Sequence, residues 1–99
     1  MNEKMIGRYV VVRASDAGVH AGILEECEGR SCVLREARRL WYWKPANGAM
    51  YLSGVATEGL DHSSRLGAPV HIYLSEDCEI IECTEKSAAS IAGMPSYAG

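Results

Sequence analysis

The stretch "VLREARRLWYWKP", residues 33–45, decides which fold this chain adopts. Helical spacing is shared by four of its apolar residues, Val33, Ala37, Leu40 and Trp41. A helix is therefore a serious alternative. However, the aromatic run Trp-Tyr-Trp disfavours a helix, and the preceding "CEGRSC" is typical of a hairpin turn. We predict a strand over residues 32–43 with a bulge near Glu36 and Ala37.

The sequence on both sides of this stretch predicts further strands. Runs of β-branched, aromatic or alternating apolar residues are bounded by turn sequences such as "ASDAG" and "SED". We expect four more strands, at residues 6–13, 19–26, 69–74 and 78–83. Residues 49–67 lack clean periodicity, which indicates a long connection with one short helical turn. Thr84 is a predicted N-cap for a short helix over "EKSAASIA", residues 85–92.

These elements indicate a mainly β fold, a small five-stranded antiparallel barrel of the SH3-like or OB-like kind with a short C-terminal helix. The 99 residues have room for a single domain, with an expected core at 6–92 and a flexible tail at 93–99. A domain of this size buries only about two-thirds of the surface that its unfolded chain exposes. Self-association into a homo-oligomer is therefore expected.

Charge and hydropathy argue against two kinds of partner. The net charge of −3 disfavours a protein that coats duplex nucleic acid, because such binding depends on excess positive charge. No apolar run approaches the roughly 20 residues of a membrane span, and the N-terminus lacks the apolar segment of a signal peptide. We therefore expect a cytoplasmic protein with no membrane partner.

The charges are unevenly distributed along the chain. Residues 30–44 contain five basic side chains and one acid, whereas residues 76–85 contain five acids and no base. One interpretation is that the two segments compensate each other across neighbouring strands or subunits. The other is that the positive segment stays available for an anionic ligand.

The basic segment also carries three consecutive aromatic residues. On a strand, Arg38, Leu40 and Tyr42 share one face, and Arg39, Trp41 and Trp43 share the other. If Leu40 belongs to the core, Arg39 stands beside two outward indole rings. Flat rings stack on a base or sugar, and the guanidinium fork matches phosphate oxygens. This pattern predicts a site for a small anionic, nucleotide-like ligand.

The predicted ligand-binding residues are Arg38, Arg39, Trp41, Tyr42, Trp43, Lys44 and His20. His20 is included because it lies between two glycines in the loop "SDAGVHAG" and can donate to an anion. The alternative is that the same tryptophans fill the core or a self-association interface, where Trp and Arg are also enriched.

Signals for catalysis and metal binding are weak. The chain has no Walker loop, no G-x-G-x-x-G and no H-E-x-x-H, and the adjacent side chains of "DHSS" do not converge as a triad. We predict no enzymatic activity, no catalytic residue and no cofactor. The cysteines fall as Cys27-x4-Cys32 and Cys78-x4-Cys83, at the edge of zinc-site spacing. The run "CEIIEC" is typical of a strand, on which residues five apart point to opposite faces, and glutathione keeps cytosolic thiols reduced. We therefore predict metal-free, reduced thiols.

Three motifs carry a family resemblance: "AGVHAG" (17–22), "ARRLWYWK" (37–44) and "EIIECTE" (79–85). Together they resemble a family of small uncharacterised phage and prophage proteins, over roughly residues 6 to 86. Pro45 departs from that pattern, in which a glycine commonly follows the lysine. The resemblance implies a phage origin and an accessory role in the cytoplasm of an infected bacterial cell.

Small non-enzymatic phage proteins often sequester host immune signals, block a host defence protein or form minor virion parts. The resemblance therefore implies a counter-defence binding protein that sequesters a nucleotide-like signal. The alternative is a protein-interaction component, either an inhibitor of a host protein or a minor virion part, that uses the same aromatic surface.

Overall fold

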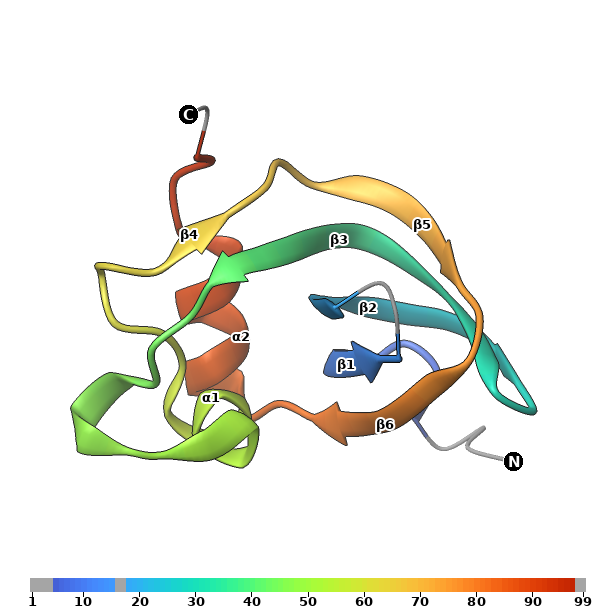
Figure 1. Cartoon of the computed structure of the whole chain (residues 1–99), viewed down its shortest axis with the longest axis horizontal. Coiled ribbons are helices and arrows are strands. Elements are labelled where there is room, and N and C mark those ends of the chain that lie inside the picture. The colour runs from blue at the N-terminus through green and yellow to red at the C-terminus, as the bar shows by residue number, and fades with distance from the viewer. Residues whose placement is uncertain (1–4, 16–17, 98–99) are drawn as a thin grey trace.

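The computed structural model describes residues 5–15 and 18–97, apart from the side chains of residues 77 and 78 (Figure 1). Its strands are β1 (Tyr9–Ala14), β2 (Gly18–Glu28), β3 (Ser31–Tyr42), β4 (Arg65–Leu66), β5 (Val70–Leu74) and β6 (Asp77–Glu82). Its helices are the short 3-10 turn η2 (Ala46–Gly48), α1 (Tyr51–Glu58) and α2 (Glu85–Ala92). The predicted mainly β fold with a C-terminal helix is confirmed.

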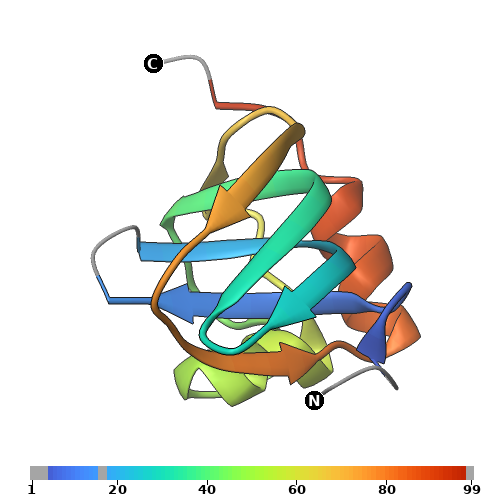
Figure 2. The same cartoon turned by 90° about the vertical axis from the view of Figure 1, so that its right-hand side faces the viewer.

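All strands pair antiparallel in one curved sheet, with the order β4-β3-β2-β1-β6 and with β5 paired to β3. Long β3 therefore pairs with β2 along one edge and with β5 and then β4 along the other. The chain bends between β5 and β6 at Glu76, whose φ is 56°, and this segment curves around the sheet in Figure 2. This bend connects β5 to β6, but the two strands are not paired in the described structure, so the six-stranded sheet is not closed into the expected five-stranded barrel.

Apolar side chains gather on both faces of β1, which explains the uninterrupted run Val10-Val11-Val12. The helix cluster, on the side covered by α1 and α2, is formed by Val11, Ala21, Leu40, Leu52, Val55, Leu60, Leu66 and Ile91. The strand cluster, on the inner side of the curved sheet, is formed by Val10, Val12, Leu24, Cys32, Leu34, Ala37 and Leu74. Because both faces of β1 are covered, its sequence does not alternate between apolar and polar residues.

The predicted bulge at Glu36 and Ala37 is present. Glu36 has a φ of 56°, and the pairing register of β3 with β5 shifts between Leu34 and Ala37. On the facing strand, a Cβ at Gly22 would lie only 2.9 Å from the Cα of Ala37. Glycine at this position therefore allows β2 to approach the bulge closely.

One α-helix matches the prediction, and the other is longer than predicted. Thr84 caps α2, because its hydroxyl accepts a hydrogen bond from the backbone N–H of Ser87 at 3.1 Å. The predicted helix over residues 85–92 is therefore confirmed. The connection over 49–67 contains more helix than expected, since α1 has eight residues. In the part of the chain that is described, no helix is long and apolar enough to cross a membrane.

Tyr9 gives the fold a pH dependence. Its hydroxyl is buried without a hydrogen-bond partner among the described residues, and burial raises the pKa of Tyr9 to about 12, with Cys83 adding to the shift. An unfolded tyrosine titrates near 10. Between about pH 10 and 12 the unfolded state therefore loses a proton that the folded state keeps, and stability falls.

We expect Tyr9→Phe to flatten this alkaline loss of stability, measured as the free energy of unfolding from pH 8.5 to about pH 11.5. At neutral pH the substitution should cost about 1 kcal/mol or less, because it removes a hydroxyl that makes no hydrogen bond within the described structure. The other titrating groups are the same in both proteins. Equal alkaline slopes would show that Tyr9 is not the group responsible.

Candidate functional site

Arg38 is buried at the junction of β3, β4 and the end of α2, with 2% of its surface exposed. Its guanidinium donates hydrogen bonds to the carbonyl oxygens of Gly67 at 2.9 Å, Ile91 at 2.8 Å and Met94 at 2.5 Å. It also contacts the hydroxyl of Ser96 at 3.4 Å. Arg38, one of the predicted site residues, therefore attaches the segment after α2 to the sheet. Its guanidinium N–H groups point into the protein and not toward the surface.

Arg39 and Trp41 form an exposed pair two residues apart on β3. The guanidinium carbon of Arg39 lies 5.1 Å from the centre of the Trp41 ring, and 63% of Trp41 is exposed. This distance is that of a cation–π contact. Gly67 of the neighbouring chain segment lies beside the pair and donates its backbone N–H to the carbonyl oxygen of Arg39 at 2.8 Å. The predicted placement of an arginine beside an outward indole is confirmed for this pair.

A register shift changes the facing of the next residues. Leu40 pairs with Leu66, but Tyr42 pairs with Arg65, so β3 has one extra residue at Trp41. An extra residue reverses the alternation of side chains beyond it. Tyr42 is consequently exposed, while Trp43 is half-buried and packs against the helix cluster. The expectation that Trp43 faces outward with Trp41 is therefore wrong.

His20 and Lys44 are the remaining predicted site residues. His20 is the ladder partner of Arg39 on β2, and only 1% of it is exposed. Lys44 is exposed, and its backbone N–H donates to the hydroxyl of Ser64 at 3.0 Å. Its carbonyl oxygen accepts from the N–H of Asp61 at 2.8 Å. These two bonds hold residues 61–64 against the end of β3 and leave the ammonium group in solvent.

A second arginine–ring pair lies beside the first. Arg65, on β4, lies over the ring of Tyr97 with 4.9 Å between the guanidinium carbon and the ring centre. Tyr97 is held there because its N–H donates to the carbonyl oxygen of Leu66 at 2.7 Å. Residues 93–97, expected to form a flexible tail, are thus hydrogen-bonded as far as Tyr97, and residues 98 and 99 lie outside the described part.

These side chains share one face of the sheet edge. Leu40 and Leu66 pair and both enter the helix cluster, so their neighbours Arg39, Trp41 and Arg65 lie on the opposite face. We call this surface the arginine–aromatic face and define it as Arg39, Trp41, Tyr42, Arg65 and Tyr97. The sequence pattern does not point to Arg65 and Tyr97, because neither lies in a periodic segment and they are far apart in the chain.

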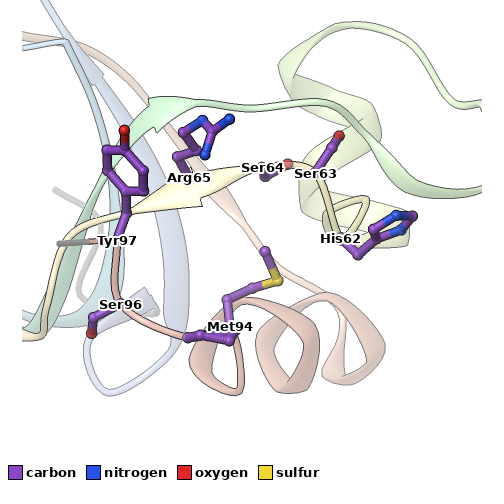
Figure 3. A pocket seen from close by; sticks show the side chains of 8 residues that line it. His62, Ser63, Ser64, Arg65, Met94, Ser96 and Tyr97 are labelled. Carbon is purple, nitrogen blue, oxygen red and sulfur yellow. The ribbon is translucent and has the colours of Figure 1, made fainter. Parts of the chain in front are cut away.

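A cavity of about 290 Å³ borders this face. It is lined by residues 62–65 on one wall and 94–97 on the other, and Figure 3 shows Arg65 next to Tyr97 at its side. The Asp61 carboxylate lies at the start of the first wall and accepts hydrogen bonds from the hydroxyl and the N–H of Ser63, which lowers its pKa. The volume lies just below the roughly 300–1,000 Å³ that is typical of small-molecule sites.

The ion pairs of the sheet leave this face positively charged. Arg8 and Arg13 of the β1 region bind Glu82 and Glu79 of β6 at 2.7 and 3.0 Å. Two acids of the acidic segment are therefore paired with arginines near β1, and no ion pair among the described side chains joins that segment to residues 30–44. Among the described side chains, those of residues 5–15, 18–76 and 79–97, no carboxylate lies within ion-pair distance of Arg39 or Arg65.

The fold and this face define a small mainly β domain with two exposed arginine–ring pairs at one edge of its sheet. The chain belongs to the family described as a domain of unknown function, DUF6948, whose model matches residues 7–91. No curated protein and no solved structure matches the chain. The family match covers every strand but ends before residues 94–97, so Tyr97 and one wall of the cavity lie beyond it.

Proposed function

We propose that this protein is a non-enzymatic binding protein that sequesters a small anionic, nucleotide-like ligand on the arginine–aromatic face. The proposal rests on a difference in the partners of the arginine side chains. Arg8, Arg13 and Arg35 lie within 4.0 Å of glutamate carboxylates. Arg39 and Arg65 instead lie over aromatic rings. Their charge is therefore available to an external anion.

The chemistry of the face suits such a ligand. A guanidinium held over a ring keeps its edge N–H groups available for phosphate oxygens, and it loses less conformational freedom when the anion binds. The exposed rings of Trp41 and Tyr42 offer flat surfaces on which a base or a ribose can stack. The adjoining cavity, which is partly open to solvent, gives the ligand additional contact surface.

The biological setting that we propose rests on the resemblance to phage and prophage proteins. In that setting the protein is an accessory counter-defence protein in an infected bacterial cell. Signals in bacterial defence are largely cyclic or ADP-ribose-type nucleotides, which are flat, anionic and small. Their chemistry matches two arginine–ring pairs better than it matches a deep apolar pocket.

The proposal is tested by titration calorimetry with ADP, ADP-ribose, a cyclic dinucleotide and inorganic phosphate. We expect Arg39→Ala and Arg65→Ala each to weaken binding about ten- to a hundredfold, since a charge-assisted hydrogen bond contributes about 1.5–3 kcal/mol. Arg39→Lys should restore only part of the affinity, because an ammonium lacks the planar fork. Trp41→Ala should cost about 1–3 kcal/mol of binding through lost stacking.

Arg35→Ala is the matched control, because Arg35 is an exposed arginine of the same strand that lies 4.0 Å from Glu25. Its affinity should equal that of the wild type. If no nucleotide binds the wild type, or if Arg35→Ala and Arg39→Ala weaken binding equally, the face is not a nucleotide site.

A second candidate function is a protein-interaction component, as an inhibitor of a host protein or a minor virion part. The exposed fractions of Trp41, Tyr42 and Tyr73, at 63%, 51% and 67%, favour it. Homo-oligomerisation through these rings is compatible with either candidate. Sedimentation of the same variants separates the cases, because an interface predicts that Trp41→Ala releases a 10.8 kDa monomer without any nucleotide being involved.

A further inference from the structure

Cys27 and Cys32 face each other across the β2–β3 hairpin. They are direct register partners, one pair further from the turn than Glu28 and Ser31. Glu28 and Ser31 close a two-residue loop, so they form a hydrogen-bonded pair, and the next pair is a non-hydrogen-bonded one. In such a pair the Cα atoms lie about 4.5 Å apart and the side chains approach each other most closely. This spacing falls within the range that a disulfide requires.

Burial and access differ between the two thiols. Cys27 is half-buried at the edge of the strand cluster, whereas Cys32 belongs to that cluster and is 2% exposed. A small cavity of about 60 Å³ is bordered by both cysteines and by Tyr73. Solvent therefore has a path to the pair, and Cys27 is the thiol that an external reagent meets first.

We propose that Cys27 and Cys32 form a dithiol site that a low-molecular-weight disulfide converts into a cross-strand disulfide. The Cys27 thiolate attacks the disulfide of oxidised glutathione, which forms a mixed disulfide and releases one glutathione thiol. The Cys32 thiolate then attacks the Cys27 sulfur and displaces the second glutathione. The two cysteines lose two protons and two electrons, and the oxidant becomes two thiols. In a reducing cytosol the pair remains as thiols.

The other cysteines offer a control and a competitor. Cys83 packs against the helix cluster, on the far side of the sheet, and burial raises the pKa of its thiol. It should therefore not exchange with the pair. Cys78 has a side chain outside the described part, so the experiment must identify its linkage directly.

The test incubates the full chain with oxidised glutathione, blocks remaining thiols with iodoacetamide and digests with trypsin without reduction. Arg30 lies between the two cysteines, so trypsin separates them into peptides 14–30 and 31–35. We expect these peptides to appear joined, lighter than their sum by two hydrogens, and to separate on reduction. Cys78 and Cys83 both lie on peptide 66–86, so a different linkage gives a different mass.

Cys27→Ser should abolish the joined species, and Cys83→Ser should leave its yield unchanged. Cys27 is half-buried, so its serine variant is expected to fold, which circular dichroism verifies. Three results would overturn the proposal: a link between peptides 31–35 and 66–86, glutathione retained on Cys27 as the only product, or no joined peptide with oxidant in excess.

Discussion

Arg38→Ala is expected to lower the free energy of unfolding by about 3–5 kcal/mol, a large part of the roughly 5–15 kcal/mol that stabilises a domain. The truncation removes the donor for the carbonyl oxygens of Gly67, Ile91 and Met94. A buried acceptor that loses its donor costs about 1–3 kcal/mol. Urea unfolding followed by tryptophan fluorescence measures the loss.

The neighbouring Arg39→Ala is the control for this prediction. The side chain of Arg39 is exposed and lies over the Trp41 ring, so its loss should change the free energy of unfolding by about 0.5 kcal/mol or less. We thus expect Arg38→Ala to lower the stability of the fold, and Arg39→Ala to weaken the proposed ligand binding with little effect on stability. If both substitutions destabilise the fold equally, the different structural roles inferred from the burial of Arg38 and the exposure of Arg39 are wrong.

Gly22→Ala is expected to destabilise the protein by about 1–3 kcal/mol. The added Cβ would overlap backbone atoms, which cannot rotate away as the end of a flexible side chain can. It would lie 2.9 Å from the Cα of Ala37 and 3.0 Å from the carbonyl oxygen of Arg35. The chain must then open the β2–β3 ladder at the bulge. Thermal unfolding of the variant reports the cost.

Gly67→Ala supplies the matched comparison for Gly22. Its added Cβ would come no closer than 3.6 Å to another residue, the indole nitrogen of Trp41, which is an ordinary contact. The same chemical change should therefore leave the unfolding temperature nearly unaltered. A Gly22 variant as stable as the Gly67 variant would mean that β2 and β3 adapt to the bulge without strain.

The strands and the C-terminal helix were predictable because their signals are local. β-branched and aromatic runs between turn sequences mark β1, β2 and β3, and the hydroxyl of Thr84 marks the start of α2. The failure of the sheet to close was not predictable in this way. It depends on how the bend at Glu76 carries the chain from β5 to β6, which no periodic pattern records.

The same distinction between local and tertiary signals applies to the candidate site. Arg39 and Trp41 were predictable as a pair, because residues two apart on a strand share a face. The inward turn of Trp43 follows from a register shift that only the pairing with β4 creates. The burial of Arg38 was not predictable either. Its partners are the main-chain carbonyl oxygens of residues 67, 91 and 94, and every residue has a carbonyl, so no residue type in the sequence identifies these partners.

The main-chain character of the Arg38 contacts also affects how this protein can diverge among relatives. A carbonyl oxygen is present whatever side chain its residue carries, so the attachment of residues 94–97 places no demand on the identities of Met94 and Tyr97. Those positions line one wall of the cavity. If the cavity binds part of a ligand, as we propose, substitutions at Tyr97 would alter which ligand fits while the hydrogen bonds of Arg38 keep the wall in place. Met94 also packs against the helix cluster, so changes at that position cost stability.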